Sequence, residues 1–495
     1  MTIIGYAHLI ETLKLKVMPI HRQACISTSV NRRVENNQNI LFPTNLALDN
    51  SLIGHLEFAI RHEGLNLEVI DATFEHIDQD ELIAKFKLTP AGASIRRLCF
   101  LWEWLTGKNL ELEFSVSGAY VDLFPADEYY TAAESIRVPK FRIRNNALGN
   151  ADFCPTVRRK SIEHSPSFSE LIDKANTALN SLKDPELYRR AVAYLYLSET
   201  KGSYAIESEK PSSDKQERFV QLLKHAGESV TVTEDWLVQL QNAIVRDVYS
   251  YEASYRTKQN WLEDSSERIT FLPTPIAELR QVMGGWERFV NDTIRCKDPL
   301  VKAACAAFGF VYIHPFLDGN GRLHRFIIQH VLAQSALLPR ETIIPVSAVI
   351  EKNVAAYFAV LSAFSKEVTK LWNYRRTDTD PIILSSPGSR PYRFFDAGRE
   401  IQFLYEMVKV TVQDEIPREL AWLQSYDRAF TRLNKELDLP QKDLAALIRM
   451  IYSNKGILSE NRRKQYAHLP EHVLNLIENI VKQECQNNQT DTVKT

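Results

Sequence analysis

The sequence predicts a mainly α-helical fold, built as a central helical core between an N-terminal region and a C-terminal helical region. Apolar residues recur every three or four positions in many segments, for example in 234–248 and 299–311, which is the spacing that buries one face of a helix. Two short runs, around Trp261 and at 269–272, favour a small β-hairpin. The length of 495 residues fits about three domains, and the 44% hydrophobic content is that of an ordinary globular chain.

Charge and cysteine content narrow the class of protein. The 60 Lys and Arg residues against 62 Asp and Glu leave a net charge of −2, so no overall field favours nucleic acid or an anionic membrane as a partner. The six cysteines are scattered without a CxxC pair or metal-ligand spacing, which is typical of a reducing compartment. We recognise no secretory signal and no apolar run of the ~20 residues that span a bilayer. These observations predict a cytoplasmic protein.

Residues 1–185 have a mixed pattern. Helical spacing of apolar residues is found in 48–61 and in 95–105. Between 122 and 166 the periodicity is lost and turn-forming residues accumulate, which favours an extended segment that wraps around the molecule. We expect this segment to hold two helical parts together.

The central part of the chain contains the strongest helical signals. Two helices are expected to begin with an Asp-Pro pair, at 184–185 and 298–299, because Asp caps a helix and Pro fits its first turn. Two short apolar runs flank the polar residues 263–268, which predicts a small β-hairpin. The helices predicted here cover 184–209, 234–248, 298 to about 314, and 321 or 322 to 338.

The C-terminal part is predicted to be helical after a linker-like segment, 381–393. Its helices are expected over 399–412, 419–437 and 441–452, and the polar tail 486–495 is expected to be disordered. The stretch 439–474 has the spacing of a helix-turn-helix and carries the basic run Asn461–Lys464. A helical packing or dimerisation unit is the preferred interpretation, and contact with nucleic acid is the alternative.

One segment, 314–325, has a composition that packing does not explain. It places glycines and ionisable residues between two apolar helices. Gly319 and Gly321 allow a close approach of backbone N–H groups, and the helix that follows presents its free N–H groups to the same place. Arg322 and Arg325 lie three positions apart, so both guanidinium groups can face one phosphate-bearing ligand. The sequence therefore predicts a phosphate-binding loop.

Two further side chains give this loop a chemical role. Asp318 supplies a carboxylate beside the glycines, which suits a Mg²⁺ ion that bridges phosphates. His314 has an ordinary pKa close to neutrality, so it can take the proton of an attacking hydroxyl. Together these residues predict nucleotidyl or phosphoryl transfer.

The loop sequence HPFLDGNGRLHR resembles the motif of the Fic (Fido) family, His-x-Phe-x-Asp/Glu-Gly-Asn-Gly-Arg-x-x-Arg, at every defined position. The resemblance implies a Fic-type helical core and AMPylation, the transfer of AMP from ATP to a hydroxyl of a protein. By this resemblance His314 is the base, Asp318 binds Mg²⁺ and Phe316 anchors the loop. It also implies that Gly319, Asn320 and Gly321 bind the α-phosphate and that Arg322 and Arg325 bind the β- and γ-phosphates.

Three further segments extend the resemblance to roughly residues 190–370. Ser203-Tyr-Ala-Ile-Glu207-Ser208 is similar to the autoinhibitory motif Ser/Thr-x-x-x-Glu-Gly/Asn, in which Glu207 would hold Arg325, although Ser208 departs from Gly or Asn. Tyr357 is similar to a tyrosine near the adenine, and packing explains it equally well. The predicted hairpin resembles the flap that pairs with a target peptide, and its residues are Gln259, Asn260, Trp261, Leu262 and Glu263.

The expected organisation follows from these assignments. Residues 1–185 are the N-terminal region, 186–230 the inhibitory-helix segment, 231–375 the Fic core and 376–495 the C-terminal region. The expected function is an autoinhibited protein adenylyltransferase that uses ATP and Mg²⁺ on a Ser, Thr or Tyr hydroxyl of a target protein or of itself. The alternatives are removal of AMP, transfer of another nucleotide or phosphate-containing group, and ATP sensing without catalysis. The sequence leaves open whether the chain forms a homodimer.

Overall fold

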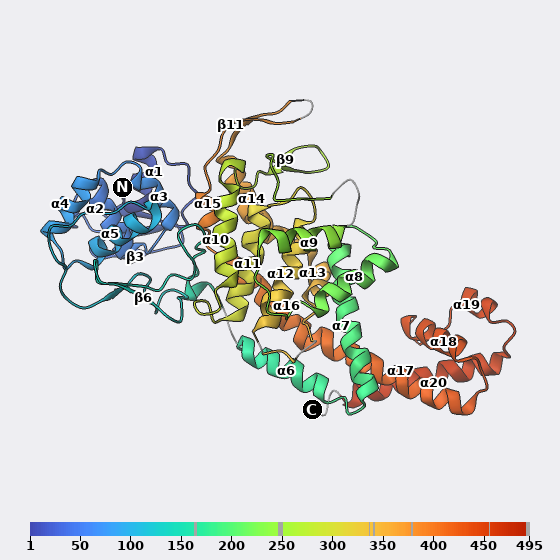
Figure 1. The fold of residues 1–495 in the computed structure, drawn as a ribbon. Coiled ribbons are helices and arrows are strands. Elements are labelled where there is room, and N and C mark those ends of the chain that lie inside the picture. Colours follow the sequence, from blue (N-terminus) through green and yellow to red (C-terminus); the bar gives the residue numbers. More distant parts are fainter. Residues whose placement is uncertain are drawn as a thin grey trace.

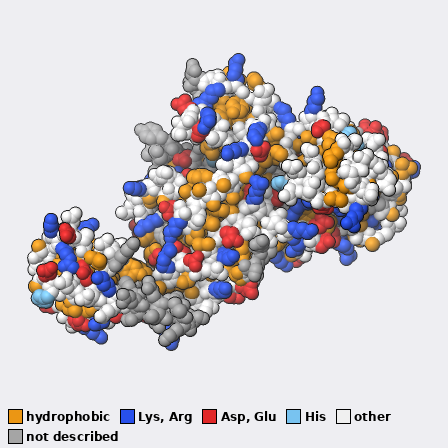
Figure 2. Space-filling model, turned by 180° about the vertical axis from the view of Figure 1, so that it is seen from behind, with side chains coloured by type: hydrophobic (Ala, Val, Ile, Leu, Met, Phe, Trp, Pro, Cys, Tyr) orange, Lys and Arg blue, Asp and Glu red, His pale blue; other side chains and the backbone are white. Residues whose placement is uncertain are grey.

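Helices dominate the computed structural model, which describes residues 1–162, 166–245, 251–335, 337–339, 342–377, 380–454 and 456–491, with side chains up to Glu484. An N-terminal unit, a central helical core and a C-terminal helical unit follow one another along the molecule (Figure 1). Acidic and basic side chains are interspersed over the face shown in Figure 2, as expected for a chain with a net charge of −2. The fold is therefore mainly α-helical, as the sequence predicts.

The N-terminal unit combines helices with two small sheets. The sequence predicts its helices α2 (Leu52–His62) and α5 (Ala93–Thr106) within a few residues. Its other helices are α1 (Gly5–Leu13), α3 (Leu67–Phe74) and α4 (Gln79–Leu88). One sheet has the order β1-β2-β4-β3 and the other β5-β7-β6. Their strands are β1 (Thr2–Ile4), β2 (Gln23–Ile26), β3 (Val34–Glu35), β4 (Asn39–Phe42), β5 (Val121–Asp122), β6 (Ile136–Val138) and β7 (Ile143–Asn145).

The segment that follows β7 joins the N-terminal unit to the core, as expected. Phe153 belongs to the core cluster and its ring packs against Gly309, whereas the neighbouring Cys154 belongs to the N-terminal cluster. The backbone N–H of Cys154 donates to the carbonyl of Arg393 at 2.8 Å. A short 3-10 turn, Arg159–Ser161, precedes the core. Residues 163–165 lie outside the described residues.

The core is a set of helices around α11. Every residue of α11 from Leu300 to Ile313 is buried, and α10, α12 and α16 pack against it. Asp298 caps α11 through its side chain, and Pro299 is its first residue, as predicted. The core elements are α6 (Phe168–Asn180), α7 (Pro185–Ile206), α8 (Ser213–Lys224), α9 (Glu234–Val245), β8 (Leu262–Glu263), β9 (Ile269–Phe271), a 3-10 turn (Ile276–Glu278), α10 (Leu279–Asn291), α11 (Pro299–Ile313), α12 (Asn320–Gln334), α13 (Val346–Lys352), α14 (Val354–Lys370) and α16 (Gly398–Val410).

Several element boundaries differ from the expected ones. α12 ends at Gln334 rather than Leu338, and the expected end of α9 at Val248 lies outside the described residues. The linker-like segment 381–393 contains β11 (Ile382–Ser385), which pairs with β10 (Asn373–Arg375), and α15 (Arg390–Arg393). Arg390 Nε lies 2.7 Å from the Asp71 carboxylate of α3, so this segment is tied to the N-terminal unit.

The C-terminal unit is a small helical bundle. A π-helical turn, Thr411–Glu415, joins α16 to α17 (Ile416–Glu436), whose first half packs on the core and whose second half packs in the bundle. The other members are α18 (Gln441–Ser453), α19 (Glu460–Gln465) and α20 (Glu471–Asp491). α20 continues into the tail that was expected to be disordered.

Within the described ranges, no single helix is both long and apolar enough to cross a bilayer. The pair α13 and α14, bent by 90° at their junction, meets the length and composition requirement only when taken together.

Candidate functional site

His314 lies at the end of α11, whose residues from Leu300 to Ile313 are all buried. It caps α11 in the left-handed conformation, with φ 57° and ψ 63°, and is 7% exposed. Its Nδ1 lies 3.2 Å from the carbonyl of Val311, which can only accept a hydrogen bond, so Nδ1 carries the proton and Nε2 is left as an acceptor. Burial lowers the pKa of His314 to about 4, which keeps the imidazole neutral at pH 7. The side chain is therefore in the form that a general base requires.

The loop after His314 is folded around Asn320. The Asn320 side chain accepts from the backbone N–H of Phe316 at 3.1 Å and donates to the Phe316 carbonyl at 2.8 Å. Phe316 is fully buried, as expected for an anchor. Gly319 adopts φ +84°, which favours glycine, and caps α12. The loop thereby directs the free N–H groups at the start of α12 toward one place, which forms an anion cradle.

Glu207 reaches this cradle from the end of α7. Arg325 Nη2 donates to the Glu207 carboxylate at 2.7 Å, and an added Cβ on Gly321 would lie 2.3 Å from the same carboxylate. Burial raises the pKa of Glu207, but Arg325, together with Arg322 and His324, more than offsets this, so the pKa lies below its usual value. A charged carboxylate thus rests where the loop is suited to bind an anion.

Arg325 is held by α7 through more than one contact. Its Nε donates to Ser203 Oγ at 2.9 Å and its Nη2 to the Ser203 carbonyl at 2.8 Å. The side chain is fully buried, and Nη1 has no hydrogen-bond partner among the described residues. Ser203 in the last turn of α7 and Glu207, which caps this helix, therefore both hold the guanidinium in place.

Arg322 is held by a second carboxylate that the sequence analysis did not single out. Its Nη1 lies 3.0 Å from the Glu209 carboxylate, and its Nη2 lies 3.4 Å from that of Asp318. Ser208, between the two glutamates, has φ 59°, the conformation that Gly or Asn adopts readily. This backbone turn sends Glu207 to one arginine and Glu209 to the other.

The arrangement fits a nucleotide phosphate and a Mg²⁺ ion. Arg322 Nε and Arg325 Nη1 are buried donors without partners in the part of the chain that the structure describes, and unsatisfied cationic donors favour an anionic ligand. The Asp318 side chain is 52% exposed beside the cradle, and one carboxylate plus phosphate oxygens is a usual ligand set for Mg²⁺. Asp318 would hold the ion and the two arginines the phosphates.

α7 is anchored to the core two turns before Glu207. The buried Glu199 carboxylate accepts from the Ser347 backbone N–H at 2.9 Å and from Ser347 Oγ at 2.6 Å, and burial raises the pKa of Glu199 to about 7. Gly202 allows α7 to approach α13 closely, because an added Cβ would lie 2.6 Å from the Ala348 nitrogen. Glu199 was missed, although its spacing of four from Ser203 and eight from Glu207 is visible in the sequence.

The predicted hairpin forms beside the loop. β8 pairs with β9 in antiparallel register. Gln259 accepts from the backbone N–H of Ile276 at 3.0 Å, and Asn260 Nδ2 donates to the Phe316 carbonyl at 3.3 Å. Trp261 Nε1 donates to Glu263 at 2.8 Å, and the Leu262 side chain is 42% exposed. The structure therefore brings the predicted flap to the His314 loop.

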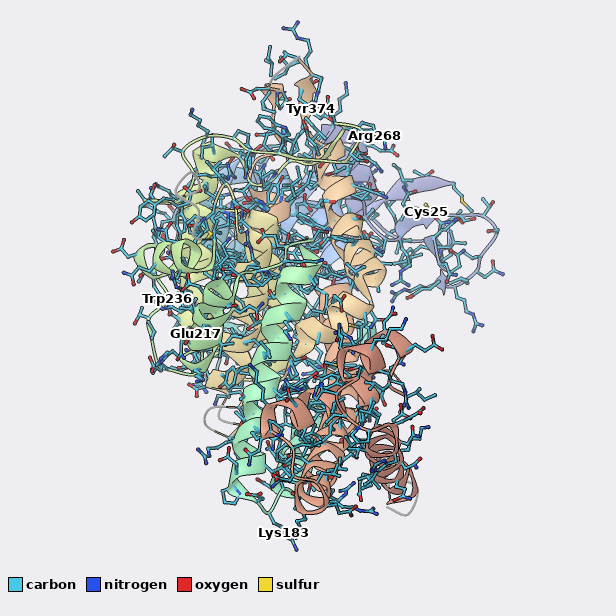
Figure 3. All side chains as sticks on the ribbon, turned by 90° about the vertical axis from the view of Figure 1, so that its right-hand side faces the viewer. Cys25, Lys183, Glu217, Trp236, Arg268 and Tyr374 are labelled. Carbon is cyan, nitrogen blue, oxygen red and sulfur yellow. The ribbon has the colours of Figure 1, made fainter. Side chains whose placement is uncertain are left out.

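A second hairpin stands next to the flap. Arg376, after β10, forms an ion pair with Glu263 of β8. Figure 3 labels Arg268 in the flap turn and Tyr374 in β10, and the two lie at the same end of the molecule. This neighbour was not predicted, because the second strand of the hairpin, β11, lies in the segment 381–393 that was expected to be linker-like.

Tyr357 lies in the core on α14 and is 2% exposed. Its ring is 5.9 Å from those of His324 and Phe403, measured between centroids. Burial raises its pKa to about 12, although the neighbouring Arg325 lowers it. Packing accounts for this position, and a contact with adenine stays a prediction.

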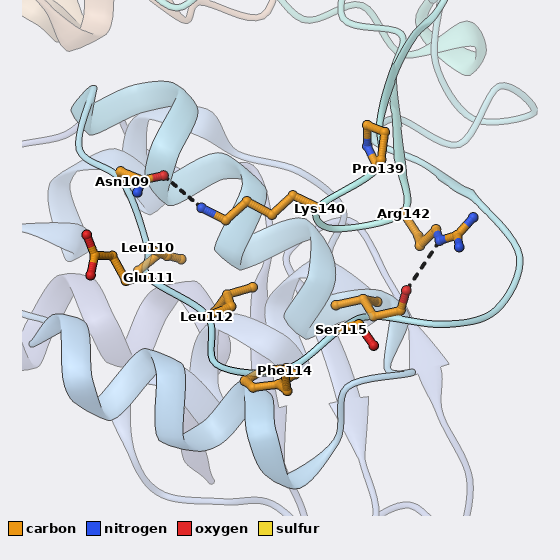
Figure 4. A pocket seen from close by; sticks show the side chains of 10 residues that line it. Asn109, Leu110, Glu111, Leu112, Phe114, Ser115, Pro139, Lys140 and Arg142 are labelled. Carbon is orange, nitrogen blue, oxygen red and sulfur yellow. Dashed lines mark hydrogen bonds between the residues drawn. The ribbon is translucent and has the colours of Figure 1, made fainter.

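Two cavities lie away from the loop. One of about 550 Å³ is in the N-terminal unit, between the extended segment Asn109–Val116 and the turn that contains Lys140 and Arg142 (Figure 4). The other, of about 480 Å³, lies between the N-terminal unit and α15. Neither contains a residue of the His314 loop.

Comparison with known proteins places the loop in a family. Residues 231–332 match the model of the Fic/DOC family. A stretch of 117 residues is 28% identical to the protein adenylyltransferase Fic of Nematostella vectensis, and the match covers 22% of this chain and 25% of that protein. This chain therefore spans about a quarter of the length of that relative.

Solved structures of Fic proteins are also similar to the chain. A Fic family protein from Desulfovibrio desulfuricans G20 is 16% identical, with a TM-score of 0.36 over 63% of this chain and 86% of that one. A Fic domain containing signaling protein from Bacteroides thetaiotaomicron VPI-5482 is 18% identical, with a TM-score of 0.34 over 50% and 97%. Fic-1 (residues 134–508) from C. elegans is 16% identical, with a TM-score of 0.33 over 50% and 72%.

The matched segment contains the His314 loop and the flap, and α7 lies before it. Residues 231–332 are therefore a Fic/DOC family domain within a mainly α-helical chain.

Proposed function

We propose that this chain is a protein adenylyltransferase of the Fic type, held inactive by its own α7. The observation that carries the proposal is the Glu207 carboxylate in the cradle at Gly321, bound to Arg325 at 2.7 Å. A site that binds its own carboxylate with a buried arginine, beside the free N–H groups at the start of a helix, is suited to a phosphate in the same place. The adenylyltransferase name of the Nematostella relative supports AMP as the group transferred.

In the proposed reaction, a hydroxyl oxygen of the target attacks the α-phosphorus of ATP. The new oxygen–phosphorus bond replaces the bond to pyrophosphate, which leaves. His314 Nε2 takes the hydroxyl proton, because Nδ1 is occupied by the Val311 carbonyl. Arg322 and Arg325 hold the phosphates that leave, and the N–H groups around Gly319–Gly321 bind the α-phosphate oxygens. Mg²⁺, held by Asp318, would neutralise charge on the phosphates.

The proposed partners follow from the flap. An extended target segment can add to the exposed edge of a hairpin by main-chain hydrogen bonds, which positions a hydroxyl with little sequence reading. We propose a Ser, Thr or Tyr hydroxyl of another protein, or of the chain itself, as the acceptor in the cytoplasm.

Mass spectrometry of the intact chain tests the proposal. The purified Glu207→Gly chain, in which no carboxylate occupies the cradle, is incubated with ATP and Mg²⁺, and in parallel with GTP, CTP, UTP or EDTA, and the mass of the adduct is measured. We expect an AMP adduct that requires ATP and disappears with EDTA. An adduct from another nucleotide would replace AMP as the group transferred. Release of AMP from a modified protein without forward transfer would make the chain a de-AMPylase.

The pH dependence of transfer tests the role of His314. Its pKa is lowered to about 4, so the neutral, proton-accepting form persists well below pH 7 and is lost only as the pH falls through about 4. We expect kcat/KM to stay constant from pH 7 to about pH 5 and then to fall. The Glu207 carboxylate raises this pKa, so its removal should not move the acid limb upward. An acid limb near the ordinary histidine value would contradict the buried environment of His314.

A further inference from the structure

One buried arginine of the flap has no role in the proposed reaction. Arg256, just before the flap residues, is 4% exposed. No carboxylate pairs with it in the described ranges, and burial lowers its pKa to about 10. A buried cation without a counterion is costly and is tolerated only where its donors are well satisfied. The groups that accept hydrogen bonds from Arg256 therefore indicate which part of the structure this costly burial stabilises.

Within the described part of the chain, the hydrogen bonds of Arg256 all go to backbone carbonyls. On one side its Nε donates to the carbonyl of His314 at 2.9 Å and its backbone N–H to that of Pro315 at 2.8 Å. On the other side Nη1 donates to the carbonyl of Lys258 at 3.0 Å and Nη2 to that of Thr274. Lys258 and Thr274 lie at the two ends of the flap. One side chain thus bridges the flap to the backbone of the proposed base.

The bridge meets His314 at a residue whose backbone is in the left-handed region. A non-glycine residue in the left-handed region is disfavoured by roughly 1–2 kcal/mol and persists only where neighbouring contacts hold it. His314 has φ 57°, and its carbonyl is held by Arg256. Asn260 adds a parallel link from the flap to the Phe316 carbonyl at 3.3 Å. Three successive carbonyls of the loop therefore accept hydrogen bonds from the flap segment.

We propose that Arg256 is a positioning residue for the transfer: it holds the His314 backbone in its left-handed conformation and sets the distance from the flap, so that the target hydroxyl and the base are placed by the same side chain. The catalytic part of this inference, the effect of Arg256 on transfer, rests on the proposed function. The mechanical coupling of flap and loop does not depend on that function.

The kinetic test uses Arg256→Lys and Arg256→Met in a Glu207→Gly chain, with Arg432→Lys, an exposed residue of α17, as the matched control. Lysine keeps the charge but cannot bridge carbonyls on both sides. We expect kcat to fall on the order of 100-fold in both variants, as for a ~1 Å misplacement, with KM for ATP little changed. An unchanged kcat in Arg256→Lys would overturn the proposal.

The acid limb of the pH profile distinguishes loss of the Arg256 charge from loss of the position that its hydrogen bonds impose. The groups that face His314 are Arg256, which lowers its pKa, and Glu207 and Asp318, which raise it. The limb should move to higher pH in Arg256→Met but not in Arg256→Lys. A merely structural defect would lower the rate without this difference.

Hydrogen exchange measured on the intact chain gives a readout that is independent of activity, and its first outcome needs no substitution. We expect amides of the flap, 256–263, and of the loop, 314–318, to open with one common free energy, because they share the Arg256 bridge. In Arg256→Lys both segments should exchange faster together. Independent opening of the two segments in the unsubstituted chain would overturn the coupling, even if Arg256 variants failed to fold. Common opening without AMP transfer would instead leave the coupling standing and the proposed function wrong.

Discussion

Replacing Glu207 with glycine is expected to raise self-modification with radiolabelled ATP by well over tenfold. The carboxylate occupies the cradle at Gly321 and binds Arg325, and a charge-assisted hydrogen bond of this kind contributes roughly 1.5–3 kcal/mol. Each ~1.4 kcal/mol corresponds to a factor of ten in an equilibrium constant. Removal of the side chain therefore frees both the space and the guanidinium that ATP needs.

Glycine at this position should leave the fold intact. Glu207 is the residue that caps the end of α7, so the substitution does not place glycine inside a helix. Glu217→Ala is the matched control, because Glu217 is an exposed carboxylate of the neighbouring helix α8 and is labelled in Figure 3. Equal rates in Glu207→Gly, Glu217→Ala and the unsubstituted chain would show that Glu207 does not inhibit.

The second carboxylate extends this experiment. Glu209 still holds Arg322 at 3.0 Å after Glu207 is removed. Adding Glu209→Gln to Glu207→Gly should raise the rate further, by less than the first substitution, because the Glu209 side chain is 40% exposed and its ion pair is screened by solvent. If the double variant were no faster than Glu207→Gly alone, inhibition would act only through the contact of Glu207 with Arg325, and the ion pair of Glu209 with Arg322 would not contribute.

The loop was predictable because its chemistry is local in the sequence. The elements that deliver His314, Gly319 and Arg325 to one place are two consecutive helices. α11 follows from its Asp-Pro pair and apolar spacing, and α12 follows directly after the glycine of the loop that caps it. Glu207 was predictable from its motif. The preference for Gly or Asn after it has a physical cause, since Ser208 takes a positive φ there. This part of the site could therefore be predicted from local backbone conformation and a short sequence motif.

The contacts that depend on tertiary structure were not predictable. Glu209 and Arg322 are far apart in sequence and meet only because the turn at Ser208 redirects the chain. In the sequence, nothing distinguishes Arg256 from other basic residues near a hairpin. Its bridging position follows only from its hydrogen bond to the loop carbonyl of His314. The small sheets of the N-terminal unit have strands of two to four residues, which are too short to show a period of two. In each case the deciding partner lies elsewhere in the chain.

His314→Ala is expected to abolish transfer in a chain that has been activated by Glu207→Gly. A positioned general base contributes typically 10²–10⁴-fold, so the rate should fall to the background of the assay. Nucleotide binding should persist, because the arginines and the cradle are separate from the imidazole. An AMP adduct measured by mass spectrometry, and ATP binding measured by calorimetry, report the two properties independently.

The interpretation of this substitution depends on its effect on the fold. His314 is 7% exposed, and removing its ring leaves space beneath the flap, so a lower melting temperature is expected as well. Asn at the same position tolerates the left-handed backbone better than Ala and serves as a second variant without a base. His225→Ala controls for loss of a histidine, because His225 is exposed on the far end of α8. If His314→Asn bound ATP and kept the transfer rate of the activated parent, the assignment of His314 as base would be wrong and proton removal would have to come from another group.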